Sequence, residues 1–105
     1  MIIQYKTPEA EANHIEFEVN KNKTTVCFDD ELTLKLSKLE KDDPVHKDIC
    51  FDQDGDLVVG AAAGWAYVAE IDIPARQYTP GETEEDPPVP VPLDMDTVTL
   101  TLWEV

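Results

Sequence analysis

The sequence predicts a single all-β domain, folded as a small antiparallel sandwich or barrel of about seven or eight strands. Three observations support this fold class. Several short runs alternate apolar and polar residues, which is the period-two pattern of half-buried strands. Turn-forming residues separate these runs. The length of 105 residues suits one hydrophobic core and is too short for two, so residues 1–105 form one predicted domain.

The first third of the chain predicts a short strand followed by a three-stranded meander. Residues 2–6 are β-prone, and Thr7-Pro8 begins a loop. Strands are then expected in three runs that alternate or are rich in β-branched residues: 14–20, 24–28 and 32–36. Because consecutive strands usually pair, these runs predict one antiparallel sheet.

Residues 37–47 permit two interpretations. Leu36 and Leu39 are compatible with a helical turn, but we expect a loop here. Beyond it, residues 49–51 and 57–59 are expected to form a hairpin. Its turn contains Asp-Gly, a strong hairpin signal because glycine adopts a positive φ without strain.

The two longest strands are expected at residues 65–73 and 97–103, and we predict that they pair. Gly60 to Gly64 has almost no side-chain bulk, which permits a tight turn or a bulge before the first of them. Alternation places Trp65, Tyr67 and Ala69 on one inward face. The predicted core is Ile15, Phe17, Val19, Val26, Phe28, Leu34, Val58, Tyr67, Ile71, Val98, Leu100 and Leu102.

The connection over residues 76–96 is long, acidic and rich in proline. Loops of more than about 12 to 15 residues without regular structure are usually functional or disordered. Its prolines favour extended backbone, and its acidic side chains repel one another. We therefore expect a hairpin arm that projects into solvent or lies against a partner.

Negative charge is concentrated in the second half of the chain. Residues 48–105 contain thirteen acidic side chains and only one basic residue, Arg76, which gives −12 of the formal net charge of −15. Binding of a nucleic-acid backbone needs clustered Lys and Arg, and anionic membranes need the same. Direct binding of nucleic acid or membrane is therefore not expected, whereas a protein with a basic surface is.

No sequence pattern indicates an enzyme. Cys27 and Cys50 are expected to be reduced, half-buried strand residues, and His14 and His46 to be exposed. Signatures of nucleophilic, metal-dependent or phosphate-binding sites are missing, so we expect neither catalysis nor a cofactor or metal. The start of the chain lacks a secretory signal, and no apolar run is long enough for a membrane span, which predicts a cytoplasmic protein.

Asp52, Asp54 and Asp56 suggest a calcium loop, since three carboxylates on alternate positions can converge on a hard cation. The pattern does not match an EF-hand, because Gly55 precedes the third acid and Ala63 stands where the closing Glu is required. A plain acidic hairpin turn is the preferred interpretation.

Composition and charge favour a non-enzymatic, acidic protein-binding module. In size and acidity, though in no motif, the chain is similar to the anti-restriction and anti-CRISPR inhibitors of phages and mobile elements. That similarity implies a nucleic-acid mimic that occupies a basic, nucleic-acid-binding surface. The alternative is a structural or accessory subunit that forms a homo-oligomer through its β edges and long arm. The predicted partner-binding residues are Asp52, Asp54, Asp56, Tyr78, Glu82, Glu84, Glu85, Asp86, Asp94, Asp96 and Trp103.

Overall fold

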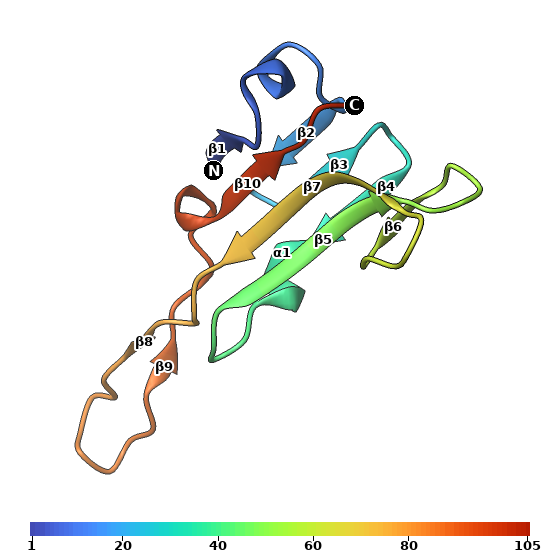
Figure 1. The fold of residues 1–105 in the computed structure, drawn as a ribbon. Coiled ribbons are helices and arrows are strands. Elements are labelled where there is room, and N and C mark those ends of the chain that lie inside the picture. Colours follow the sequence, from blue (N-terminus) through green and yellow to red (C-terminus); the bar gives the residue numbers. More distant parts are fainter.

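A computed structural model describes residues 1–105 and shows a mostly-β chain with two sheets around one core and a projecting arm (Figure 1). The five-stranded sheet has, in spatial order, β1 (Ile2–Tyr5), β10 (Thr99–Leu102), β7 (Ala66–Ile73), β5 (Val45–Phe51) and β6 (Leu57–Val59). The three-stranded sheet contains β2 (Phe17–Asn20), β3 (Thr25–Phe28) and β4 (Leu32–Lys35). The predicted all-β class and the predicted meander are confirmed, and no sheet closes into a barrel.

The remaining elements are short. Three helical turns are present: η1 (Pro8–Glu11), α1 (Leu36–Leu39) and η2 (Met95–Thr97). The arm contains β8 (Tyr78–Thr79) and β9 (Val89–Pro90). The two sheets of the body contain eight strands, and the arm raises the total to ten, above the seven or eight predicted.

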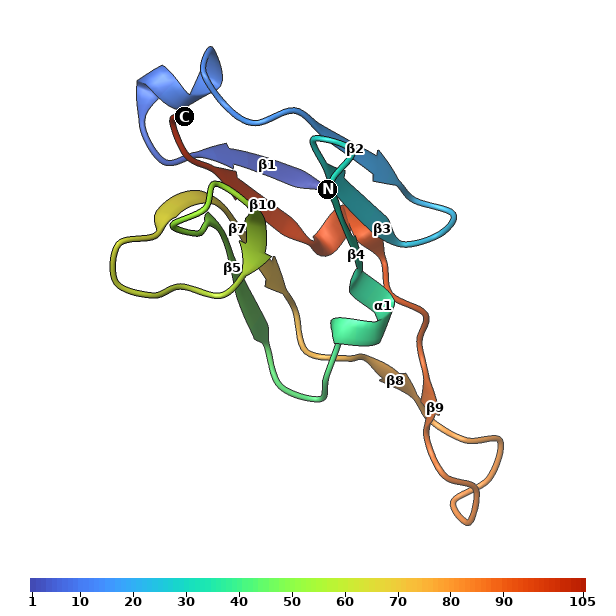
Figure 2. The same ribbon diagram turned by 90° about the vertical axis from the view of Figure 1, so that its right-hand side faces the viewer.

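The core lies between the two sheets. Val26 and Phe28 of β3 are fully buried, as are Ile49, Ile71 and Leu100 on the central strands of the larger sheet. Figure 2 shows the three-stranded sheet facing the five-stranded one, with α1 beside the gap that these side chains fill. Of the predicted core, five residues are only partly buried: Phe17, Val19, Leu34, Val58 and Tyr67. The first three still pack against the core.

The strand β1 pairs with β10 in parallel, so the prediction of a purely antiparallel fold is wrong at this edge. A parallel pair needs a long connection, and here the rest of the chain between the two terminal strands supplies it. Elsewhere in the sheet the pairs are antiparallel, including the predicted pair of β7 and β10 and the predicted Asp-Gly hairpin between β5 and β6.

A β-bulge in β7 changes which side chains face inward. Ile49 lies opposite Ala69 and Cys50 lies opposite Tyr67, so Val68 is one extra residue in its strand. Val68 and Ala69 are consequently both fully buried. The alternation reverses at this point, and the prediction that Trp65 and Tyr67 share the inward face of Ala69 is wrong.

The prediction of a loop over residues 37–47 is also wrong in part. Leu36 is fully buried and Leu39 packs against the core, so the α1 turn forms where the apolar spacing permitted it. The strand β5 begins at Val45 rather than at residue 49, because its first residues pair with the end of β7.

The turn between β3 and β4 contains two acidic residues in the left-handed conformation. Asp29 and Asp30 both have a φ of 52°, and Glu31 N donates to Phe28 O at 2.9 Å to close the turn. Positive φ at both central positions is the requirement of the tight hairpin turn that Asn-Gly satisfies best. Non-glycine residues in this conformation carry strain.

Replacing this pair by Asn-Gly is expected to stabilise the fold. The double substitution Asp29→Asn and Asp30→Gly should raise the free energy of unfolding by about 1 kcal/mol, because both residues then tolerate a positive φ. Urea unfolding measures the change. Asp29→Ala with Asp30→Ala removes the same two charges and should destabilise, so equal stabilisation by both variants would attribute the effect to charge and contradict the prediction.

The arm extends away from both sheets and lengthens the molecule to 53 Å against 25 and 22 Å in the other directions (Figures 1 and 2). Its root is fixed by Arg76, whose Nη2 donates to Glu40 O at 2.9 Å, and by the Tyr78 hydroxyl, which donates to Asp42. The tip closes on itself, since a Cβ on Gly81 would lie 2.5 Å from Asp86 Cβ. The side chains from Glu82 to Pro90 are all exposed, as the sequence predicted.

Candidate functional site

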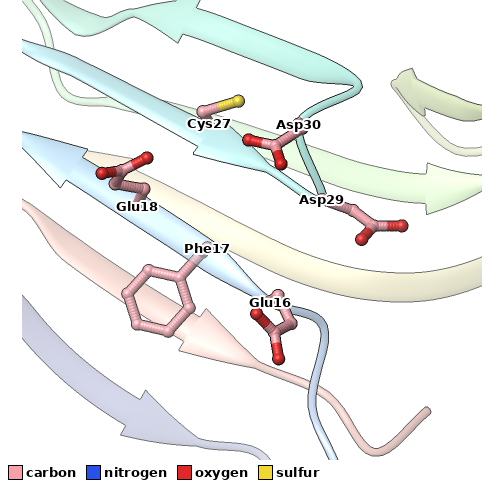
Figure 3. A pocket seen from close by; sticks show the side chains of 6 residues that line it. All are labelled: Glu16, Phe17, Glu18, Cys27, Asp29 and Asp30. Carbon is pink, nitrogen blue, oxygen red and sulfur yellow. The ribbon is translucent and has the colours of Figure 1, made fainter.

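The outer face of the three-stranded sheet contains an acidic hollow of about 350 Å³. We define it by its lining residues, Glu16, Phe17, Glu18, Cys27, Asp29 and Asp30. The alternation of β2 and β3 creates it: inward Val19, Val26 and Phe28 leave the intervening side chains on the outer face. Figure 3 shows Glu18 and Asp30 beside Cys27, Glu16 at the start of β2 and Asp29 after the end of β3, whereas the Phe17 ring points to the opposite side of β2 from Glu18. A second hollow of about 360 Å³ adjoins it and shares Glu18 and Cys27.

The carboxylates of the acidic hollow have no cationic partner within the molecule. Six of the 23 acidic side chains form ion pairs: Glu40, Asp42, Asp48, Glu70, Asp72 and Asp96. The other 17 form none, and all four acids of the hollow are among them. Crowded like charges destabilise a fold and attract cations or basic side chains.

A second cluster lies on the outer face of the five-stranded sheet, where the strand register places four titratable side chains in a square. His46 and Asp48 are two residues apart on β5, and their cross-strand partners on β7 are Asp72 and Glu70. His46 Nδ1 lies 2.6 Å from Asp72 Oδ1, and His46 Nε2 lies 2.8 Å from Asp48 Oδ1 and 3.5 Å from Glu70 Oε1. The expected exposure of His46 is confirmed, but three carboxylates lie close to its imidazole ring.

Two further side chains hold Glu70 in this square. Trp103 Nε1 donates to Glu70 Oε2 at 2.8 Å, and Lys6 Nζ lies 3.9 Å from the same oxygen and 5.0 Å from the centroid of the Trp103 ring. The Trp103 ring stacks on Tyr67, with centroids 4.7 Å apart and an interplanar angle of 18°. These aromatic residues therefore pack on the outer face and not in the core.

Three pKa values are shifted in and beside this cluster. The pKa of His46 is raised, first by its hydrogen bond to Asp72 and then by that to Asp48, because both carboxylates stabilise the imidazolium. Burial raises the pKa of the Cys50 thiol, and the charges of Asp48 and Glu70 add to the shift. Burial likewise raises the pKa of Tyr67, followed by the charge of Asp48. Cys50 is thus a protonated thiol, inert as a nucleophile at neutral pH.

The two cysteines are free and lie on the outer faces of different sheets, with the core between them. The prediction of reduced strand cysteines is consistent with this placement, although Cys50 is fully buried rather than half-buried. His14 is half-buried and not exposed as predicted. Its ring lies between Tyr5 and Phe17, with centroids 6.0 and 5.8 Å away.

The predicted partner-binding residues do not form one surface. Glu82, Glu84, Glu85 and Asp86 are at the tip of the arm and Tyr78 is at its root, whereas the turn of Asp52, Asp54 and Asp56 is at the opposite end of the molecule (Figure 1). Trp103 donates to Glu70, a member of the square on the other sheet face. The carboxylate of Asp94 caps η2 by accepting from Asp96 N at 2.9 Å.

Asp96 has a structural role. Its Oδ1 lies 2.6 Å from Lys21 Nζ and 3.5 Å from the amino terminus, which joins the β2–β3 turn to η2. The hydrogen bond with Lys21, then the charge of Lys21, lowers the pKa of Asp96. A carboxyl group whose folded-state pKa is depressed stabilises the fold above its unfolded pKa and loses that contribution as the pH falls.

The substitution Lys21→Ala is therefore expected to raise the pKa of Asp96 toward its ordinary value and to weaken the acid dependence of stability below about pH 4. A pH titration of the Asp96 carboxyl carbon by NMR measures the shift. Lys23→Ala, which removes a lysine of the same turn, is the control and should leave the Asp96 pKa unchanged. An equal shift in both variants would mean that general charge, and not this ion pair, sets the pKa.

Sequence reasoning missed both outer-face clusters. A signal for the acidic hollow was present, since Glu16 and Glu18 occupy the polar face of a predicted strand next to an acidic turn. The square around His46 had no local signal, because β5 and β7 are separated in sequence and their register depends on the bulge at Val68.

Comparisons of this chain with protein-family models, with curated proteins and with solved structures found no match. Helices in the structure are all too short to cross a membrane.

Proposed function

We propose that this protein is a non-enzymatic, acidic binding module that occupies a basic surface of another protein. The observation that carries the proposal is the acidic hollow, in which four carboxylates lie together without an internal cation. The strained Asp29–Asp30 turn forms one side of it. Strain and charge repulsion at one place weaken the fold, and such features cluster at functional sites.

The lining of the hollow suits a lysine or arginine side chain. Cys27 offers apolar surface to an aliphatic stem, while the surrounding carboxylates accept hydrogen bonds from its charged end. Arginine is the better fit, because a planar guanidinium makes paired hydrogen bonds with carboxylates. The adjoining hollow extends the surface for a second contact.

The finer form of the proposal is inhibition by nucleic-acid mimicry in the cytoplasm. Carboxylates spaced along β2 and its neighbouring turn take the place of phosphates, and the basic groups that would contact a nucleic acid bind them instead. The acids of the arm and of the Asp52–Asp56 turn add a long-range field that steers association.

The test is capture of a partner from the native host at moderate salt, followed by binding measurements over increasing salt. Exposed charge pairs are screened within about 10 Å at 0.1 M salt, so affinity should fall steeply. A hollow variant carries Glu16→Gln, Glu18→Gln, Asp29→Asn and Asp30→Asn. Its control is an arm variant with Glu82→Gln, Glu84→Gln, Glu85→Gln and Asp86→Asn, which removes the same net charge.

Loss of binding in the hollow variant and retention in the arm variant would support the hollow as the contact. Equal losses in both variants would show that only overall charge matters. Binding that does not respond to salt would contradict an electrostatic contact altogether.

A second candidate is assembly through the arm. Tyr78 and Val89 are 44% and 55% exposed on its short two-stranded ladder, where large apolar side chains gain little unless a partner covers them. This candidate predicts a stable homo-oligomer in light scattering that is lost when residues 80–92 are deleted. A monomer that the deletion leaves unchanged would contradict it.

A further inference from the structure

The square on the outer face of the five-stranded sheet has the arrangement of a metal site. His46, Asp48 and Glu70 each offer one ligand atom, these atoms all lie within 4.8 Å of one another, and the residues come from two paired strands. We propose that these three side chains bind a divalent transition-metal ion, with Zn²⁺ as the best fit. This site is independent of the acidic hollow, which lies on the other sheet.

The separations of the donor atoms agree with a common metal centre. Bonds of about 2.0 to 2.1 Å from Zn²⁺ to imidazole nitrogen and carboxylate oxygen, in tetrahedral geometry, place ligand atoms about 3.3 Å apart. The observed distances from His46 Nε2 are 2.8 Å to Asp48 Oδ1 and 3.5 Å to Glu70 Oε1. For these two pairs of atoms, shifts of about half an ångström suffice. Three protein ligands leave the fourth position of a tetrahedral site open to water.

Groups outside the donor set hold two of the three ligands, His46 and Glu70, in a suitable orientation. Asp72 accepts from His46 Nδ1, which fixes the tautomer and turns Nε2 toward the two carboxylates. Trp103 and Lys6 occupy Glu70 Oε2, so Oε1 is the oxygen that faces His46. Metal-ligating histidines almost always have such a carboxylate or carbonyl partner on the second ring nitrogen.

The charge of the square also suits a divalent ion. Asp48, Glu70 and Asp72 contribute −3, and Lys6 contributes +1. A protonated His46 leaves one negative charge uncompensated, whereas a divalent ion with neutral His46 brings the sum to zero. The mixed nitrogen and oxygen donors favour Zn²⁺ over Ca²⁺, which prefers oxygen ligands alone.

The other group of potential ligands is the turn of Asp52, Asp54 and Asp56. It contains only carboxylates, and Asp52 Oδ1 already accepts from the backbone N–H groups of Asp54 and Asp56 at 2.9 Å. This turn serves as the control for cation attraction by acidic residues.

The experiment is calorimetric titration of Zn²⁺ into the full chain after removal of metals with a chelator. One ion should bind per chain, and His46→Ala and Asp48→Asn should each abolish the isotherm. Asp72→Asn removes no ligand and should weaken binding about 10- to 100-fold. Asp54→Asn removes the same charge from the acidic turn and should change nothing. Thermal unfolding of each metal-free variant shows that it is folded.

NMR of the two imidazole rings gives a second measurement on unmodified protein. Saturating Zn²⁺ should shift His46 Nε2 and leave His14 unchanged, since no carboxylate lies against the His14 ring. Ca²⁺ at the same concentration should not displace the Zn²⁺. The proposal would be overturned if Asp54→Asn weakened Zn²⁺ binding as much as Asp48→Asn. It would also be overturned if Zn²⁺ shifted the NMR signals of both histidines equally, or if Ca²⁺ displaced the bound Zn²⁺.

Discussion

The substitution Leu100→Ala is expected to lower the free energy of unfolding by about 2 to 5 kcal/mol. Leu100 is fully buried on β10, and β10 lies between β1 and β7 in the sheet. Hydrogen-bonded neighbours on both sides therefore limit how far the core can close around a truncated side chain. Removal of a buried leucine side chain costs its transfer free energy and leaves a cavity that the neighbouring strands close only in part. Chemical denaturation followed by tryptophan fluorescence measures the change.

The control for this prediction is Thr101→Ala on the same strand. Thr101 is the next residue of β10 and points to the opposite, outer face, where a truncation creates no core cavity. A change within about 0.5 kcal/mol is expected there. Similar losses in both variants would mean that β10 is buried on both faces and would contradict the assignment of its inward side.

The substitution Phe28→Ala is expected to cost about 3 to 5 kcal/mol, the largest loss of any single change considered for this chain. Phe28 on β3 is the largest fully buried side chain that the smaller sheet contributes to the shared core. Without it, the three-stranded sheet keeps its own hydrogen bonds but loses its main contact with the five-stranded sheet. Amide hydrogen exchange should therefore accelerate first in β2, β3 and β4.

Phe17→Ala is the matched control, because Phe17 pairs directly with Phe28 across the sheet and is only partly buried. Its loss should be smaller, since Phe17 is only partly buried and part of its surface is already in contact with water. If the two substitutions cost the same, or if exchange accelerates evenly over both sheets, then Phe28 is not the main link between them.

Much of the fold could be predicted because its local signals agree with its tertiary structure. The meander was predictable from alternation and from its acidic and asparagine-rich turns, and the β5–β6 hairpin from its Asp-Gly pair, where Gly55 has a φ of 81°. The pairing of β7 with β10 followed from the length and order of the two strands. In each case the residues that decide the structure are close together in the sequence or follow one another as strands.

Other features depend on contacts that no local pattern encodes. The bulge at Val68 is decided by the register of β7 against β5, so the outward position of Tyr67 could not be derived from alternation alone. The parallel pairing of β1 joins the two ends of the chain. The short β8–β9 ladder pairs Tyr78 with Pro90 and Thr79 with Val89, in a segment where the prolines predicted extended backbone but gave no indication of strand pairing.

The candidate sites show the same division. The sequence identified where negative charge accumulates, and the arm and the Asp52–Asp56 turn do carry it. It did not indicate which carboxylates lack a cationic partner. In the sequence Asp96 and Glu16 are both acidic residues with no evident partner, but in the structure Lys21 pairs with Asp96 and no cation pairs with Glu16. Ion pairing is a property of the folded surface, and it separates carboxylates that hold the structure together from those that are free to contact another molecule.

The extended arm has a practical consequence for how this protein behaves in solution. A compact domain of this length has a radius of gyration of about 13 Å, whereas this chain has 15.9 Å because of its 53 Å long axis. A monomer of such shape diffuses like a heavier globular particle and elutes early from a sizing column. Elution volume alone would thus suggest a dimer, and the mass of the particle has to come from light scattering or sedimentation.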